Sequence, residues 1–197
     1  MDLSELQDAL ASKSFGKIGE ICDNLMLQVA STGISFQQDW PYSIHLLGHV
    51  YANDLNSARF LWKSIPSGVK ESRAEVVAAW KIGQCLWNRD YAGVHASIRG
   101  FDWSPEAVGL VTAFGESYAK RNFQLLVSAY STISVADTAL FLGMSEDDAT
   151  SYALQHGWTW DSTARMLAIQ KPKTVSEQKL DSSKLQSLVE YVFHLEH

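Results

Sequence analysis

A short pattern recurs four times along the chain, and its spacing limits the folds that the chain can adopt. In each copy a polar stretch precedes a large apolar residue that opens a helix-like pattern, and these anchor residues are Phe15, Leu55, Tyr91 and Phe123. The anchors are 40, 36 and 32 residues apart, which is the period of stacked helical hairpins. A single hairpin cannot bury its apolar face, so each must pack on the next. The sequence therefore predicts a solenoid-like array of helices.

Helical periodicity predicts the individual helices of this array. Apolar residues recur every three or four positions from Leu3 onward, as in helices that bury one face. Residues 69–87 are predicted to form one long helix. Another is expected to run from Ser104 to about Lys120, because Ser104 can cap it and a proline suits the first turn. These patterns assign residues 1–121 to a helical-repeat region.

The pattern changes after Ser131, where short strands and helices replace the repeats. The predicted elements are a strand at Ile133–Val135, a helix at Asp137–Leu142, a second helix capped by Ser145, and two strands at Trp158–Trp160 and Arg165–Ile169. With a tight turn at Gly143 between the helices, this order predicts a winged-helix subdomain over residues 122–170. Trp158 and Trp160 are two positions apart on a predicted strand, so both are expected to cover the core from one side.

The end of the chain is predicted to be a linker followed by an amphipathic helix. Residues 171–183 are polar and without periodicity. Residues 184–197 carry an apolar stripe at helical spacing, which consists of Leu185, Leu188, Val189, Val192 and Leu195. Such a stripe on a terminal helix needs a partner surface. The fold is therefore expected to be mostly α: helical repeats and a winged helix in one domain, then a C-terminal helix.

The charge of the predicted winged helix argues against DNA binding, the usual role of such units. Residues 122–164 contain no Lys or Arg, and their charge of −5 comes from Asp137, Glu146, Asp147, Asp148 and Asp161. A helix N-terminus offers only about half a positive charge to a phosphate, which three acids in the first turn more than cancel. We therefore expect no nucleic-acid partner and interpret these acids as helix caps. The exposed edge of the small sheet is expected to dock a protein instead.

The sequence offers little catalytic chemistry. His45 and His49 are spaced to face one metal ion on a helix, but Leu46 stands where a zinc protease needs a glutamate. Cys22 and Cys85 are far apart and form no thiolate cluster. We therefore expect no catalytic, cofactor-binding or metal site and no enzyme activity. Stoichiometric bound zinc would favour the alternative, an enzyme that uses the two histidines.

The composition is typical of a soluble intracellular protein. The chain of 197 residues is 46% hydrophobic, has a net charge of −6 and contains no run of 18 apolar residues. Its first residues resemble neither a signal peptide nor a transit peptide. We expect no membrane partner.

One alternative function remains open, that of a winged-helix transcription regulator. Tight binding to duplex DNA would favour it.

Four segments in fixed order carry a family resemblance: NSARFLWKSIP (Asn56–Pro66), AWKIGQCLWNRDYAGVHASI (Ala79–Ile98), LLVSAYSTISVADTALFLGM (Leu125–Met144) and GWTWDSTARML (Gly157–Leu167). Together they resemble the PCI family, whose members are scaffold subunits of the proteasome lid, the signalosome and translation initiation factor three. Within the family, the chain is most similar to a small signalosome subunit. The resemblance implies a non-catalytic scaffold of the complex that removes the ubiquitin-like protein Nedd from cullins and thereby regulates cullin-RING ubiquitin ligases. A small PCI subunit of the proteasome lid or of the initiation factor is the alternative.

The resemblance also implies two interaction surfaces. PCI subunits join through winged helices placed side by side, and their C-terminal helices gather into a shared bundle. By this analogy a neighbouring PCI subunit is bound through Ile133, Val135, Trp158, Trp160 and Met166. Several signalosome subunits are bound through Leu185, Leu188, Val189, Val192 and Leu195. The resemblance further implies a location in nucleus and cytoplasm and, in plants, a part in repressing light-dependent development.

Overall fold

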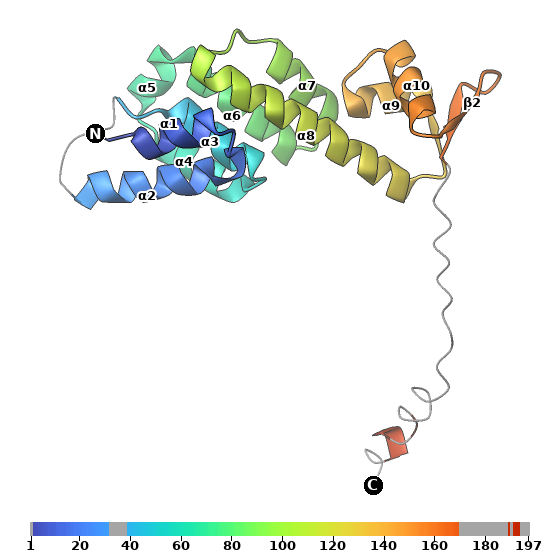
Figure 1. The fold of residues 1–197 in the computed structure, drawn as a ribbon, viewed down its shortest axis with the longest axis horizontal. Coiled ribbons are helices and arrows are strands. Elements are labelled where there is room, and N and C mark those ends of the chain that lie inside the picture. The colour runs from blue at the N-terminus through green and yellow to red at the C-terminus, as the bar shows by residue number, and fades with distance from the viewer. Residues whose placement is uncertain (1, 32–38, 170–188, 190, 194–197) are drawn as a thin grey trace.

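The computed structural model describes residues 2–31, 39–169, 189 and 191–193, and its first part is an array of helices (Figure 1). The elements are α1 (Ser4–Ala11), the short 3-10 helix η1 (Phe15–Lys17), α2 (Ile18–Ser31), α3 (Tyr42–Tyr51), α4 (Leu55–Ser64), α5 (Ser67–Ser72), α6 (Ala74–Trp87), α7 (Tyr91–Arg99) and α8 (Pro105–Ala129). Helix α3 lies in the middle and packs against α2, α4, α6 and α8. The predicted solenoid-like array is confirmed.

The second part is a winged helix at the end of α8 (Figure 1). It consists of β1 (Thr132–Ser134), α9 (Val135–Leu142), α10 (Glu146–Gln155), β2 (Thr159–Asp161) and β3 (Met166–Ala168). The strands form one antiparallel sheet in the order β1-β3-β2. The prediction of a mostly α fold that ends in a winged helix is confirmed. In the part of the chain that the structure describes, no helix has the length and apolar character needed to cross a membrane.

One kind of turn explains the repeat in the sequence. Three residues, each two positions before an anchor, have a positive φ: Lys13, Asn53 and Arg89. In each turn the following amide donates to the carbonyl five residues earlier, which closes the preceding helix. In the second and third turns, the side chains of Asp54 and Asp90 then accept a hydrogen bond from an amide three residues later and cap the next helix. The repeat is thus a helix stop followed at once by a helix start.

The fourth copy of the pattern is not a turn. Phe123 lies inside α8, which continues to Ala129 instead of ending near the predicted Lys120. The helix continues because Phe123 and Leu126 still lie on an apolar face, which is buried in the winged helix. The predicted boundary between residues 121 and 122 therefore falls within one helix.

The single helix predicted over residues 69–87 is two helices. Arg73 has extended backbone angles (φ −120°, ψ 91°) and separates α5 from α6. Its Nη1 donates to the backbone oxygen of Trp40 at 3.0 Å. The break therefore coincides with a contact to a residue far away in the sequence, which helical periodicity alone does not reveal.

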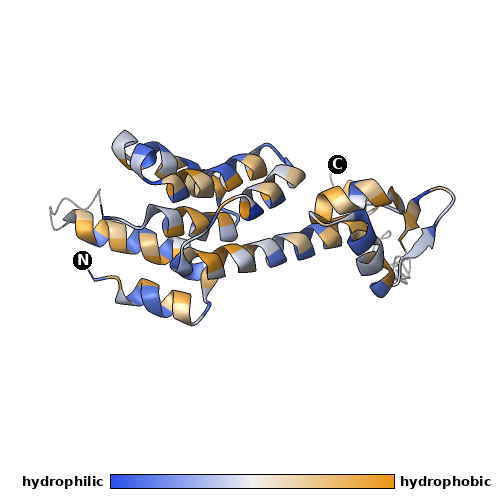
Figure 2. Cartoon of the chain, turned by 90° about the horizontal axis from the view of Figure 1, so that it is seen from above, coloured by the Kyte–Doolittle hydropathy of each residue, from blue (hydrophilic) through white to orange (hydrophobic). Residues whose placement is uncertain are grey.

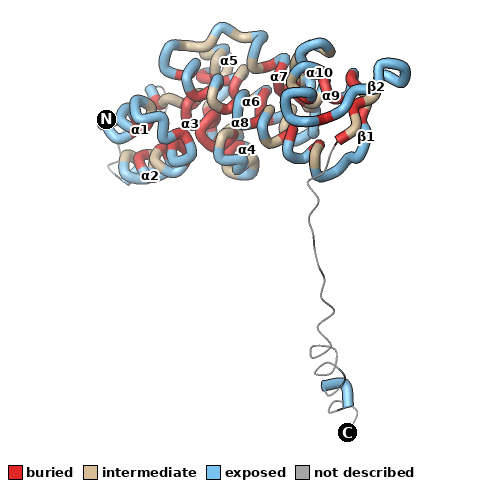
Figure 3. Tube along the Cα trace, turned by 45° about the vertical axis from the view of Figure 1, so that its right-hand side comes forward, coloured by how far each residue is buried: buried red, intermediate tan, exposed pale blue. Residues whose placement is uncertain are grey.

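The apolar residues form two cores that meet along α8 (Figures 2 and 3). The larger core fills the helical array and extends to Tyr118, and the smaller one begins at Phe123 and fills the winged helix. Full burial of one large aliphatic side chain contributes about 1.5–3 kcal/mol before entropy is counted. Because one helix contributes to both cores, its burial links the stability of the two parts.

Candidate protein-interaction surfaces

The winged helix presents strand β2 at an edge of its sheet. In the described sheet β2 is the last strand, and Trp160 lies opposite Leu167 of β3. All three residues of β2 are exposed, and Trp160 is 51% exposed. An exposed edge strand offers backbone groups to another chain, and a large aromatic side chain adds apolar area to such a contact. We call β2 with Trp160 the hairpin edge.

The structure places three of the predicted docking residues inside the winged helix. Ile133, Val135 and Trp158 are buried, and Trp158 stacks on Phe123 with ring centroids 4.9 Å apart. Val135 was expected in a strand but is the first residue of α9. These side chains pack inside the subdomain and do not face outward. Docking through them stays a prediction, and their burial argues against it. Met166 is half-buried at the start of β3.

The expectation that Trp160 covers the core together with Trp158 is wrong. The amide of Trp158 donates to the carbonyl of Ala153 at 3.1 Å and closes α10, so the strand begins only at Thr159. The two-residue alternation of a strand therefore does not relate the two tryptophans. One is buried and the other faces solvent.

The acidic start of α10 is stabilised locally. Ser145 Oγ accepts a hydrogen bond from the amide of Asp148 at 3.1 Å and donates to that residue's carboxylate at 2.7 Å. Glu146 forms an ion pair with Arg165 in the β2–β3 turn, while Asp147 is exposed. Two of the three acids thus have partners that fix the helix and the hairpin. This agrees with their interpretation as caps, and the Arg165 pair is a contact that the sequence did not indicate.

The turn between α9 and α10 docks on the helical array. Gly143 has φ +67°, and its carbonyl accepts from Arg99 Nη1 at 2.7 Å. The carbonyl of Phe141 accepts from His95 Nε2 at 3.3 Å and from Asn122 Nδ2 at 3.0 Å. Burial lowers the pKa of His95, which keeps its imidazole neutral, and the bond to the Phe141 carbonyl opposes this shift only in part. The first helix of the helix-turn-helix therefore faces its own chain.

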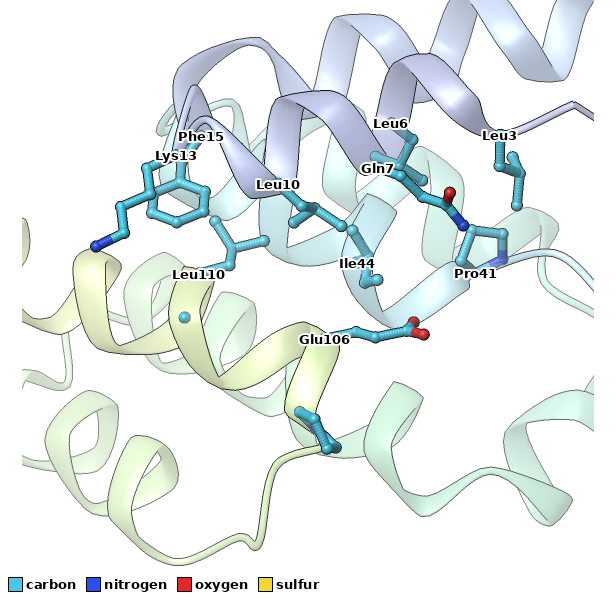
Figure 4. A pocket seen from close by; sticks show the side chains of 12 residues that line it. Leu3, Leu6, Gln7, Leu10, Lys13, Phe15, Pro41, Ile44, Glu106 and Leu110 are labelled. Atoms are coloured by element: carbon cyan, nitrogen blue, oxygen red, sulfur yellow. The ribbon is translucent and has the colours of Figure 1, made fainter.

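Two hollows in the surface have no counterpart in the sequence pattern. One, of about 410 Å³, lies between α1 and the start of α8, with Lys13 at one end and Glu106 on its wall (Figure 4). The other, of about 260 Å³, lies at the junction of α8 and α9 and is lined by Tyr91, Leu125 and Phe141 among others. Both are built from helices distant in sequence, so no local motif could have predicted them.

The C-terminal stripe is described in part. Val189 and Val192 are helical and 54% exposed, and the neighbouring Tyr191 and Phe193 are also exposed. Leu185, Leu188 and Leu195 lie outside the described residues. The described part therefore presents apolar side chains to solvent, as an interaction segment does before it meets a partner.

One group of described side chains could share a metal ion. It consists of Asp23 on α2 and His45 and His49 on α3. The group lies in the helical array and not in the winged helix. The sequence indicated the two histidines but gave no signal for Asp23.

Comparison with known proteins decides the family. The family model described as CSN8/PSMD8/EIF3K matches residues 37–178. The chain belongs to the CSN8/PSMD8/EIF3K family. The match begins before α3 and extends past the end of β3, so it includes most of the helical array and the whole winged helix.

Three relatives in this family extend over the whole of the present chain. The chain is 62% identical over 197 residues to a protein of Arabidopsis thaliana named COP9 signalosome complex subunit 8, and the alignment covers all of both chains. It is 36% identical to the Xenopus laevis protein of that name, again over all of both chains. It is 28% identical to the Dictyostelium discoideum protein, with 100% of this chain and 98% of the relative covered. The similarity therefore includes the first 36 residues and the C-terminal stripe.

Replacing Gly143 with alanine is expected to cost more stability than the same change at Gly157. Both glycines have positive φ, which for alanine costs about 1–2 kcal/mol. A Cβ at Gly157 would meet nothing, whereas a Cβ at Gly143 would overlap the His95 ring, which adds overpacking of about 1–3 kcal/mol. Urea unfolding of the two variants measures the difference.

Combining Gly143→Ala with His95→Ala separates the two contributions. The double variant should recover the overpacking cost and keep the backbone cost, so the two changes should be less than additive. Strict additivity, or equal costs at Gly143 and Gly157, would show that the turn does not dock on His95 as described.

Proposed function

We propose that the chain is a subunit of the COP9 signalosome and acts there as a non-catalytic scaffold. The observation that carries this is the 62% identity, over the full length of both chains, to a plant protein named as subunit 8 of that complex. Relatives from animals and an amoeba carry the same name. The alignments include the helical array, the winged helix and the tail in organisms as different as a plant, an animal and an amoeba. This supports a role in an assembly that uses all three parts.

The scaffold role is supported by how the polar groups of the winged helix are used. The serine and acid groups at the starts of α9 and α10 cap those helices: Ser134 bonds to Asp137, and Ser145 to Asp148. Groups occupied in this way stabilise structure and are poorly placed to act on a substrate. The isopeptidase step that the family resemblance implies is then the work of another subunit.

Two exposed surfaces are suited to partners of the same complex. The hairpin edge can extend its sheet with a neighbouring subunit's winged helix, since β2 ends the described sheet and carries the exposed Trp160. The helical segment that includes Val189 and Val192 can enter a bundle of terminal helices. We propose a neighbouring PCI subunit for the first surface and several subunits for the second.

The proposal includes location and cellular role. A signalosome subunit would be found in nucleus and cytoplasm, would support removal of the ubiquitin-like protein Nedd from cullins, and in a plant would help to repress light-dependent development. The alternative, a small PCI subunit of the proteasome lid or of translation initiation factor three, shares the family but not the name of the full-length relatives.

Mass spectrometry of proteins that co-purify with the tagged full chain tests the assembly directly. The expected result is a near-stoichiometric set of signalosome subunits, because a scaffold subunit is held by large interfaces. Recovery of proteasome-lid or initiation-factor subunits in that stoichiometry would instead establish the alternative.

Replacing Val189 and Val192 with aspartate together is expected to reduce incorporation into the complex. Burial of a valine contributes about 1.5 kcal/mol or more, so loss of two buried valines weakens binding by a hundredfold or so. Both are 54% exposed, so the melting temperature of the isolated chain should not change. Co-purification from cells that express both forms gives the readout.

Leu27→Asp provides the matched control for this pair. Leu27 is 70% exposed on α2, far from the tail in sequence, and its change places one aspartate, where the tail variant carries two, at an exposed apolar position. Wild-type incorporation of the Val189 and Val192 variant, or an equal loss in the Leu27 variant, would argue against a specific role for the tail.

Trp160→Ser is expected to weaken the contact with the neighbouring subunit without unfolding the winged helix. The indole is half exposed on an edge strand, so its removal should change the melting temperature little. Phe60→Ser on α4, which removes another exposed aromatic (68%), is the control. Pairwise co-purification with individual signalosome subunits should show one partner lost with Trp160→Ser and none lost with Phe60→Ser. Retention of every partner would exclude the hairpin edge as a docking surface.

A further inference from the structure

Three donor atoms converge where α2 crosses α3. His45 Nε2 lies 2.9 Å from Asp23 Oδ1 and 3.1 Å from His49 Nε2. The third separation, from His49 Nε2 to Asp23 Oδ1, is 3.4 Å. The two histidines are four residues apart on α3, so their rings lie on one face of that helix. The aspartate comes from the neighbouring helix and completes a triangle.

The size of this triangle fits a tetrahedral metal ion. Nitrogen and carboxylate ligands bind zinc at about 2.0–2.2 Å, which places neighbouring ligand atoms about 3.3–3.6 Å apart. The 3.4 Å separation lies within this range, and the 2.9 Å and 3.1 Å separations fall short of it by a few tenths of an ångström. Two histidines and one carboxylate are also a ligand set that zinc proteins use. Small outward shifts of the side chains would therefore admit the ion.

The three side chains are open to solvent at Asp23 and closed off by packing at the two histidines. His45 and His49 are buried, whereas the Asp23 side chain is 51% exposed. His45 Nδ1 accepts a hydrogen bond from the Trp40 indole, so this imidazole is neutral, which is the form that binds a metal. Solvent at the aspartate side can supply a fourth ligand.

Trp40 opposes the ion and limits its affinity. Its indole Nε1 donates to His45 Nδ1 at 3.2 Å. A neutral histidine that binds a metal through Nε2 carries its proton on Nδ1, and it then needs an acceptor there. The indole offers a second donor instead, so the ring of Trp40 must move when the metal enters. The site therefore has two states, one held by hydrogen bonds and one by the ion.

We propose that Asp23, His45 and His49 form a binding site for a single divalent transition-metal ion, best zinc, with water as the fourth ligand. The ion joins α2 to α3 and strengthens the N-terminal end of the helical array. Its affinity is set by competition with the Trp40 hydrogen bond. This site does not depend on membership of the signalosome.

Cobalt(II) titration of the purified, metal-free full chain tests the proposal. The expected result is one bound ion with the intense visible absorption of four-coordinate cobalt, which zinc displaces. Asp23→Asn and His49→Gln should each weaken binding by tenfold or more, while His156→Gln, an exposed histidine on the winged helix, should not. Zinc should raise the melting temperature of the wild type and leave that of Asp23→Asn unchanged. A cooperative melting transition of Asp23→Asn in the same experiment shows that the variant is folded.

Trp40→Phe makes the test specific to this geometry. Removing the indole donor leaves His45 Nδ1 free to carry its proton, so cobalt and zinc should bind about tenfold more tightly than to the wild type. Weaker binding in Trp40→Phe would overturn the competition. Absence of four-coordinate cobalt in the wild type, or binding that persists in both Asp23→Asn and His49→Gln, would overturn the site itself.

Discussion

The architecture depends on α8, which is the one helix among the described residues whose side chains belong to both hydrophobic cores. At 25 residues and about 1.5 Å per residue, it is long enough to pass from the helical array into the winged helix. Tyr118 lies in the first core and Phe123 in the second, and between them Asn122 donates to the Phe141 carbonyl of the winged helix. The two parts are thus joined by a shared helix and a docked turn instead of a flexible linker. A scaffold needs this property, because it must hold its partners in a fixed relative position.

Local sequence signals predicted what local interactions determine. The turns at Lys13, Asn53 and Arg89 depend on a helix stop and a start within a few residues, so the repeat was visible as spacing. The winged helix was visible for the same reason, through its caps and Gly143. Where contacts between residues distant in sequence determine the structure, the sequence patterns gave wrong or incomplete predictions. Phe123 has the sequence pattern of a residue that begins a helix, but it lies inside α8 because it packs on Trp158 of the winged helix. Asp23 is far from the histidines in sequence and lies beside them because α2 crosses α3.

The acidic helix of the winged helix illustrates how charge can exclude one class of partner while the fold admits another. Its carboxylates bond to Ser145 and Arg165, which stabilises the helix and ties it to the hairpin. The same groups repel phosphate, and the first helix of the motif is covered by α7 through His95 and Arg99. Exposed surfaces of the described winged helix include the hairpin edge and the outer face of α10. Backbone pairing with another protein requires no basic residues, so this combination favours protein contacts.

The histidine cluster lies at a close crossing of two helices, α2 and α3. A Cβ on Gly48 would lie 2.7 Å from the amide nitrogen of Gly19, so the two helices can approach this closely only because both residues are glycines. Burying two imidazoles at such a crossing is costly unless each is hydrogen-bonded, and aliphatic side chains of similar volume would avoid the cost. The chain instead has polar groups there and satisfies them with Trp40 and Asp23. An arrangement that places polar groups where aliphatic side chains could pack, and brings three donor atoms within ligand distance of one point, is easier to explain by a bound ion than by packing alone.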